Sequence, residues 1–389
     1  MTGIQSSAPR HTHVAAHCGI VPPYLLARLA TLRDPKFQAA ADAARRSLQH
    51  DRPLRQIRQS ASLLATWPQT TVAQPIDEPH RTIADAHGRE MLPGTLVRRE
   101  GQPPTADVAV NEAYDGLGHT FNLFLSAFSR ASIDGAGLPL DATVHYGLEY
   151  DNAFWNGERM VFGDGDGEVF NRFTASLSVV GHELTHGVTQ FTANLEYQGQ
   201  SGALNESMSD VFGALVEQHA RRHSTAEASW LIGEGLFTDQ VQGVALRSLK
   251  APGTAYDDDV LGTDPQPASM TDYVTTADDN GGVHINSGIP NRAFYLVAEA
   301  LGGYAWEAPG QIWYDTLTGS DLSPTADFAA FAAATHTAAA ARYGADSPER
   351  EAVAAAWVTV GVPVAENPVP EYAVPEYVVP DGEQAYEAG

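Results

Sequence analysis

The sequence predicts an α+β fold in which a β-rich lobe is followed by a helical lobe, and three observations support it. From about residue 80 the chain consists of turn residues and short apolar runs, such as Thr143-Val-His-Tyr-Gly147. Strands followed by helices are typical of α+β architecture. The motif His182-Glu-Leu-Thr-His186 belongs to the first of the later helices and would lie where the lobes meet, and clefts form at such junctions. The helices predicted after residue 173 span 173–190, 204–222, 288–301, 325–343 and 347–358.

The residues ahead of the β-rich lobe predict one apolar element and one helix. Val21-Pro-Pro-Tyr-Leu-Leu26 is compact, apolar and stiffened by two prolines. Asp34-Pro35 is an N-cap followed by proline at the first helical position, so a helix is expected through Leu48. Asp51-Arg-Pro53 is expected to end this helix, and residues 60–79 resemble an exposed linker.

The β-rich lobe is expected to contain one helix, at residues 111–130, and a hairpin over Met160–Phe170. Gly163-Asp-Gly-Asp-Gly-Glu168 would form the tight turn of that hairpin. An EF-hand calcium loop is a poor match, because Val169 occupies the position that needs glycine.

These elements divide the chain into four parts. Residues 1–68 precede the lobes, 69–190 form the β-rich lobe with the metal-binding helix, 191–363 form the helical lobe, and 364–389 form a tail. The tail repeats Val-Pro-Glu-Tyr and carries acidic residues but no basic ones. Proline at this frequency forbids a regular helix, so we expect an extended, solvated tail, with a peptide ligand for a partner as the alternative.

Composition excludes several classes of protein. The chain has 389 residues and a formal net charge of −25, which makes nucleic acid an unsuitable partner. No apolar run approaches the ~18 residues of a membrane span. Cys18 is the sole cysteine, so no intramolecular disulfide can form. The N-terminus lacks a basic start followed by an apolar run, so no Sec signal peptide is expected.

The charge is unevenly distributed along the chain. Residues 1–66 carry nine Lys and Arg against three Asp and Glu, whereas the remainder is strongly acidic. This asymmetry predicts that the basic N-terminal segment docks on the acidic body. The alternative is that both surfaces are separately solvated.

Residues 182–210 predict a catalytic zinc site. His182 and His186 are four residues apart in H-E-x-x-H, so on a helix both imidazoles reach one metal ion. Glu206 begins a second helical pattern and is the candidate third ligand. Three protein ligands leave an open position for water, which is the catalytic arrangement of zinc. Glu183 lies close enough to take the proton of that water and deliver it to a leaving amine.

Further side chains fit the needs of amide hydrolysis. Ligand histidines need their second nitrogen anchored, and Asp210 and Asn205 are the candidates. Tyr197 and His284 are candidate donors to an oxyanion. Asp279 could orient the His284 imidazole and raise its pKa. No G-x-S-x-G elbow, Walker loop or dinucleotide fingerprint is present.

Residues 80–362 resemble the catalytic domain of the thermolysin family of zinc metallopeptidases. The Pro22-Pro-Tyr-Leu25 element resembles the short propeptide of the protealysin-like subgroup, which makes residues 1–68 a propeptide. The matching motifs occur in the same order and spacing, and they are Asn152-Ala-Phe-Trp-Asn156, the Gly163–Glu168 turn, Val180–His186, Gly202–Glu206, Leu246-Arg-Ser248 and Asp279–Gly288.

The resemblance implies a two-lobed zincin and an endopeptidase with the roles given above for the zinc ligands, Glu183, Tyr197, His284, Asp279 and Asp210. It also implies that Asn152 and the Ala153 backbone hold the substrate peptide and that Arg247 binds a substrate carbonyl. An apolar pocket would favour cleavage before bulky hydrophobic residues. Its residues are Phe170, Phe173, Val179, Ile232, Leu236 and Leu246.

The resemblance breaks down at the family's calcium sites. Glu217 and Glu234 remain at the double site, but other positions where acids are expected are not acidic. Affinity for calcium follows the number of charged ligands, so at most one weak calcium site is expected. The replaced positions are Ser178, Ser229, Leu231 and, at another calcium site, Val244.

The N-terminal segment is expected to inhibit the enzyme until it is removed. Pro22, Pro23 and Tyr24 would hold it in the cleft, and cleavage by the enzyme itself would fall before Leu63, Leu64 or Val72. Cys18 could ligate the zinc of the latent form through its thiolate, or serve as a small apolar packing residue.

We therefore expect a zinc metalloendopeptidase made as a zymogen, with one catalytic Zn²⁺. The rivals are a zinc amidase for small or cell-wall peptides and a permanently latent binding module. Expected partners are peptide or protein substrates, the propeptide and a proteinaceous inhibitor, with no nucleic acid and no membrane span, and the chain is expected to be a monomer. A cytoplasmic location is expected, with secretion by a non-Sec route as the alternative.

Overall fold

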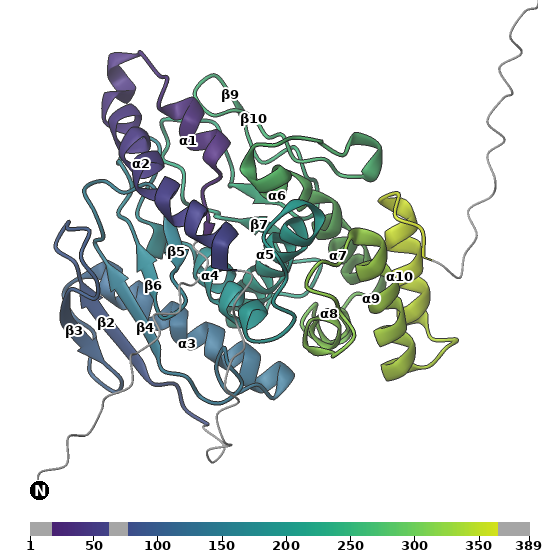
Figure 1. Cartoon of the computed structure of the whole chain (residues 1–389). Coiled ribbons are helices and arrows are strands. Elements are labelled where there is room, and N and C mark those ends of the chain that lie inside the picture. The colour runs from purple at the N-terminus through teal and green to yellow at the C-terminus, as the bar shows by residue number, and fades with distance from the viewer. Residues whose placement is uncertain (1–17, 62–76, 365–389) are drawn as a thin grey trace, which may run out of the picture.

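The computed structural model describes residues 18–61 and 77–364 and shows the two predicted lobes (Figure 1). The first contains a six-stranded sheet in the order β1-β5-β6-β4-β2-β3. The pairs β2–β4 and β4–β6 are parallel and the others antiparallel. The strands are β1 (Cys18–Gly19), β2 (Arg81–Asp85), β3 (Thr95–Arg99), β4 (Leu140–Val144), β5 (Ala153–Trp155) and β6 (Met160–Phe162).

Helix α3 (Val108–Phe128) packs against β2 and β4 of this sheet and against α4 (Leu177–Gln190) and α5 (Gly199–Arg221). The side chain of Asp107 caps its start by accepting the N–H of Val110 at 3.2 Å. Because one face of α3 covers the sheet and another meets α4 and α5, this helix joins the two lobes through a common apolar core.

The second lobe is helical and contains two short strand pairs, β7 (Leu231–Ile232) with β8 (Arg247–Ser248) and β9 (Asp257–Asp258) with β10 (Gly262–Thr263). The α+β prediction is therefore confirmed. Besides α5, its helices are α6 (Asp279–Asn286), α7 (Gly288–Leu301), α8 (Ala308–Thr318), α9 (Phe328–Tyr343) and α10 (Pro348–Thr359), and short 3-10 turns occur at η1 (Pro35–Phe37), η2 (Phe173–Ala175) and η3 (Met270–Asp272).

Close contact between α4 and α5 positions the predicted metal ligands. A Cβ atom added to Gly213 of α5 would lie 2.5 Å from the Ser178 carbonyl oxygen and 3.0 Å from the His182 nitrogen. Only glycine permits this approach of the two helix backbones. As a result, the residues on the facing turns of α4 and α5 meet in a buried seam between the lobes.

The N-terminal segment lies across both lobes as α1 (Pro23–Leu29) and α2 (Gln38–Ala61), coloured purple in Figure 1. Leu25, Leu26 and Leu29 of α1 are buried. The predicted helix stop at Asp51-Arg-Pro53 is wrong, because α2 continues to Ala61. A proline removes one backbone N–H bond from a helix, but it does not by itself end the helix here.

Two further predictions need correction. The hairpin over Met160–Phe170 does not form, because β6 ends at Phe162 and pairs with β5 and β4, while Phe170 pairs with Phe237. Instead, Asp166 accepts the N–H groups of Glu168 and Val169, both at 2.6 Å, and closes a local turn. Helix α8 was also missed.

Candidate metal centre

Three ligand side chains converge between α4 and α5. His182 and His186 come from α4 and Glu206 from α5, all three are buried, and their ligand atoms lie within 4.8 Å of one another. The Nε2 atoms of His182 and His186 are 3.1 Å apart. Glu206 carboxylate oxygens lie 3.6 Å and 3.5 Å from these two nitrogens.

The other nitrogen of each imidazole is anchored, as predicted. Asp210 lies 2.8 Å from His182 Nδ1, and the Asn205 side-chain oxygen lies 2.8 Å from His186 Nδ1. Both partners accept hydrogen bonds, so each Nδ1 carries the proton and each Nε2 presents a lone pair. Two lone pairs and a carboxylate that face one another suit a tetrahedral zinc ion with one open position.

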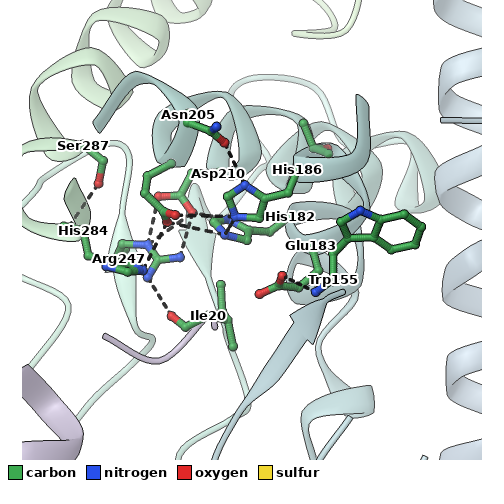
Figure 2. Close-up of polar contacts among 12 residues, drawn as sticks. Ile20, Trp155, His182, Glu183, His186, Asn205, Asp210, Arg247, His284 and Ser287 are labelled. Atoms are coloured by element: carbon green, nitrogen blue, oxygen red, sulfur yellow. Dashed lines mark hydrogen bonds and ion pairs between the residues drawn. The ribbon is translucent and has the colours of Figure 1, made fainter. Parts of the chain in front are cut away.

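Asp210 also binds Arg247, the arginine predicted to contact a substrate carbonyl (Figure 2). Its carboxylate accepts Arg247 Nε at 2.9 Å and Nη2 at 2.9 Å, and it accepts Asn291 Nδ2 at 2.8 Å. Burial alone would raise the pKa of Asp210, but the Arg247 charge and the bond to His182 lower that pKa to about 2. Asp210 is therefore an anion that connects a metal ligand with Arg247.

Two predicted oxyanion donors lie on one side of the ligand set. The Tyr197 hydroxyl contacts Glu206 and is 3.3 Å from His284 Nε2. Asp279 lies 2.7 Å from His284 Nδ1 and also accepts the backbone N–H of His284 at 2.9 Å. The expected glycine-rich loop is here the start of α6, where left-handed backbone at Asn280–Gly282 turns His284 inward.

The candidate general base lies at the edge of the sheet. Glu183 is fully buried on α4, one residue from His182, and its Oε2 accepts the backbone N–H of Trp155 in β5 at 3.0 Å. Trp155, which follows the predicted substrate-binding residues Asn152 and Ala153 in the same segment, therefore lies beside Glu183 (Figure 2).

Comparison with known proteins identifies the family of this arrangement. The family model "Thermolysin metallopeptidase, catalytic domain" matches residues 67–190, and "Thermolysin metallopeptidase, alpha-helical domain" matches residues 193–362. The chain belongs to the thermolysin family. It is a zinc-dependent metalloendopeptidase, as the sequence predicts.

Relatives in the thermolysin family match nearly the whole chain. An extracellular metalloprotease of Pectobacterium carotovorum subsp. carotovorum is 50% identical over 90% of this chain and 97% of its own length. Protease PrtS of Photorhabdus sp. (strain Az29) is 47% identical, over 90% and 93%. The solved precursor of protealysin, a metalloproteinase from Serratia proteamaculans, is 52% identical with a TM-score of 0.79 and covers 89% of this chain and 99% of its own. The predicted protealysin-like subgroup is thus confirmed.

The residues predicted for the specificity pocket are all buried, within the large apolar cluster that forms the core of both lobes. Phe170 and Phe173 pack with ring centroids 5.6 Å apart, and β7 brings Ile232 opposite Arg247 of β8. Ile20, from the N-terminal segment, belongs to the same cluster and is fully buried. The other predicted pocket residues in this cluster are Val179, Leu236 and Leu246.

The N-terminal segment forms hydrogen bonds with the residues predicted to bind substrate. Strand β1 pairs antiparallel with β5, with Cys18 opposite Trp155. Beyond it, Ile20 N–H donates to Ala153 O at 3.1 Å, and Val21 N–H donates to Asn152 Oδ1 at 2.9 Å. Arg247 Nη1 donates to Ile20 O at 3.0 Å.

Helix α2 adds polar contacts to the segment that precedes β5. Arg46 pairs with Glu149 at 2.6 Å, and Ser47 Oγ accepts the Asp151 N–H at 3.0 Å. Asp51 accepts the Tyr150 hydroxyl at 2.6 Å and Asn152 Nδ2 at 3.0 Å. These contacts support the predicted docking of the N-terminal segment on the body of the protein. Most of them are hydrogen bonds or apolar contacts, and few are pairs of opposite charges.

The predicted Pro22, Pro23 and Tyr24 element lies where Ile20 leaves the cleft. Pro22 is the N-cap of α1 and Pro23 is its first residue. Burial raises the pKa of Tyr24 well above its usual value, with Tyr256 and Asp264 adding to the effect. The side chain of Cys18 and the expected cleavage points at Leu63, Leu64 and Val72 lie outside the residues whose placement is described, and so does the tail.

The residues expected at the double calcium site have protein partners of their own. Glu217 pairs with Arg221 at 2.9 Å, and burial raises the Glu217 pKa. Glu234 is exposed, and Ser178 Oγ accepts the Gly233 N–H at 3.1 Å. A guanidinium thus provides the positive charge beside Glu217.

Within residues 18–61 and 77–364, no helix is long and apolar enough to cross a membrane.

Proposed function

We propose that the chain is a zymogen whose N-terminal segment occupies the substrate site of its own catalytic domain. One observation carries this proposal. Ile20 and Val21 bind Ala153, Asn152 and Arg247 through their backbone groups, as an extended substrate would. The Ile20 side chain is fully buried, as a bulky hydrophobic substrate residue would be.

We assign the following roles to the site residues. His182, His186 and Glu206 would hold zinc, which when bound would act as a Lewis acid that lowers the pKa of its water and polarises a carbonyl. Glu183 accepts a proton from the attacking water and delivers it to the leaving amine. Tyr197 and His284 donate to the oxyanion, and Asp279 keeps His284 oriented.

The position of the N-terminal segment indicates which residues bind a substrate. Asn152, the Ala153 carbonyl and Arg247 would hold the substrate backbone, and the apolar cluster around Phe170 and Leu246 would take the side chain after the cleaved bond. Desolvation of that side chain favours bulky apolar residues. Phe173 makes the pocket shallow.

A casein-digestion assay on the self-processed chain tests these roles. We expect digestion that a zinc chelator abolishes and added zinc restores. Glu183→Ala, with its N-terminal segment removed by a trace of wild-type enzyme that is then separated, should show no digestion because the proton acceptor is lost. The exposed Glu158→Ala should digest casein as the wild type does. Cleavage of short peptides without casein digestion would favour a zinc amidase. A fully processed chain without any cleavage would favour a binding module.

The place and partners of the enzyme are also proposals. The names of two relatives describe an extracellular metalloprotease and a protease, and nothing in the comparisons supports a cytoplasmic location. We therefore favour secretion by a non-Sec route, which activity in the culture medium would test. A monomeric state and a proteinaceous inhibitor remain predictions; size-exclusion chromatography tests the first.

A further inference from the structure

Two buried carboxyl groups lie beneath the proposed substrate-binding segment. Asp151 directly precedes Asn152, and its side chain is fully buried. Asp166 belongs to the local turn that follows β6 and is 9% exposed. The two carboxyl groups lie within side-chain hydrogen-bonding reach of each other.

Three of their four oxygens have no side-chain or backbone donor within ordinary hydrogen-bond geometry among the described residues, although the backbone N–H of Asp166 lies close enough to Asp151 to lower its pKa. These are both oxygens of Asp151 and Oδ2 of Asp166, whereas Oδ1 of Asp166 accepts two backbone N–H groups. Two ionised carboxylates in this position would repel each other strongly at low dielectric. A single proton between them removes the repulsion and supplies the missing bond.

The surrounding charges do not neutralise the pair. On α2, Arg46 is the cation that acts on Asp151, but its guanidinium already binds Glu149 at 2.6 Å. Burial and the charge of Asp166 raise the pKa of Asp151 well above its usual value, and burial also raises the pKa of Asp166.

Also on α2, the Asp51 carboxylate accepts hydrogen bonds from the Tyr150 hydroxyl and Asn152 Nδ2. His50 Nε2 is hydrogen-bonded to the Tyr146 hydroxyl at 2.8 Å. In the local turn, Glu168 accepts the Ala40 N–H of α2 at 2.9 Å.

The pair ties together two segments that already touch. Gly163 N–H donates to Asn152 O at 2.9 Å, and Gly165 N–H donates to Tyr150 O at 3.3 Å. A Cβ atom on Gly163 would lie 1.9 Å from Tyr150 O, so the backbones are in direct contact. On the other side of this segment, Asn152 Oδ1 holds the N–H of Val21.

We propose that Asp151 and Asp166 share one proton and act as positioning residues for Asn152. The inference rests on the proposed role of Asn152 in holding the substrate backbone. Loss of the proton would push the two segments apart and disorient Asn152. The metal ligands and Glu183 are on α4 and α5 and would keep their places. Substrate binding should therefore weaken at alkaline pH while the chemical step does not.

Infrared spectroscopy tests the shared proton without any need for catalysis. The full-length chain carrying Glu183→Ala, which also removes one buried carboxyl, is compared with the same chain carrying Asp151→Asn as well. We expect a protonated-carboxyl band at pH 7 that disappears with Asp151→Asn. Identical spectra for the two chains would overturn the proposal.

The positioning role is tested by kinetics on the self-processed enzyme. In the wild type, KM for a peptide should rise about tenfold at alkaline pH with kcat unchanged. Asp151→Asn donates the bond without titrating, so its KM should stay flat, and the exposed Asp321→Asn should follow the wild type. The same alkaline KM rise in Asp151→Asn and wild type would overturn the positioning role.

Amide exchange in the inactive full-length chain provides a second readout of Asn152. Protection of the Val21 N–H should fall about tenfold at alkaline pH with Glu183→Ala alone and stay constant when Asp151→Asn is added. Equal pH dependence in both chains would contradict the inference. If no peptide is cleaved at any pH, the proposed function fails, and this readout still decides whether the pair positions Asn152.

Discussion

At the residue scale, Asp210 connects a metal ligand with the predicted substrate-binding arginine. One buried carboxylate accepts hydrogen bonds from His182, Arg247 and Asn291. The metal ligand and the group that grips the Ile20 carbonyl are thus held by the same anion. Changes at Asp210 should affect metal binding and backbone recognition together.

We predict that Asp210→Asn weakens zinc binding by about 10- to 100-fold, because the imidazole of His182 loses its charged acceptor. KM should rise as well, since Arg247 loses its partner. Competition with a chromogenic chelator measures the zinc affinity. The exposed Asp239→Asn is the control, and a zinc affinity equal to that of wild type would contradict the assignment.

A second residue-scale prediction concerns His145. The hydrogen bond to Asp164 raises its pKa to about 9 against the effect of burial, and Asp107 adds to the rise. Because the folded state binds this proton more tightly, the stabilisation is complete below the usual histidine pKa of about 6.5 and is lost as pH rises through about 9.

His145→Asn should therefore lower the free energy of unfolding at pH 7 by about 1 kcal/mol, a modest loss because solvent reaches the imidazole. Asparagine tolerates the left-handed backbone at this position, where φ is 54°. Urea unfolding at pH 7 and pH 10 measures the difference, which should vanish at the higher pH. An equal difference at both would refute the charge assignment.

Local spacing explains which site residues could be predicted. His182, Glu183, His186 and Glu206 lie on two helices, where the spacing decides which side chains share a face. Ile20, Asp51 and Asn291 were missed because their roles depend on contacts with distant parts of the chain. The sequence predicts Asp51 only as a residue that ends a helix.

At the element scale, the docking of the N-terminal segment combines β1, α1 and α2. Strand β1 extends the sheet at β5, α1 buries its leucines, and α2 binds the segment from Tyr146 to Asn152. Arg28 of α1 also donates to the backbone oxygens of Asp259 and Val260, at 2.6 Å and 2.9 Å. The basic segment thus meets part of the acidic body through carbonyl groups.

We predict that Asp51→Asn speeds the loss of the N-terminal segment by about tenfold or more. The buried Asp51 carboxylate accepts hydrogen bonds on both oxygens, whereas an asparagine side chain accepts through one atom and donates through the other. Mass spectrometry of the purified chain over time measures the loss. Asp42→Asn is the matched control on the same helix, since the Asp42 side chain is about half exposed and its partners Gln38 and Arg45 also belong to α2. Equal rates for both variants would show that Asp51 does not hold the segment.

Elements with strong periodicity were predicted best. The helix expected at 288–301 has those bounds, whereas α5 begins at Gly199, five residues before the expected 204. Its first turn carries no apolar signal and is held by Ser201 Oγ, which donates to Glu196 O at 2.8 Å. The Met160–Phe170 hairpin failed because Asp166 closes a local turn and Phe170 pairs with distant Phe237.

At the scale of the whole molecule, the lobes are joined by buried side chains and glycine contacts around α4. The resemblance predicts that several calcium-binding acids of the family are replaced in this chain. Arg221 beside Glu217 provides a built-in cation. The stability of this protein should therefore depend little on calcium.

We predict that the melting temperature in micromolar calcium stays within a few degrees of its value in a calcium chelator, because few charged ligands remain. Differential scanning calorimetry measures it, with a chelator that spares zinc. A large rise in melting temperature with micromolar calcium would show that a strong site exists.

The central claim is that a zinc peptidase is held latent by its own N-terminal segment. The most direct measurement follows peptidase activity and chain mass in one purified sample as residues through about 68 are lost. We predict that the intact chain is inactive and that activity rises in proportion to the shortened form. Full activity in a chain that still begins at Met1 would contradict this account.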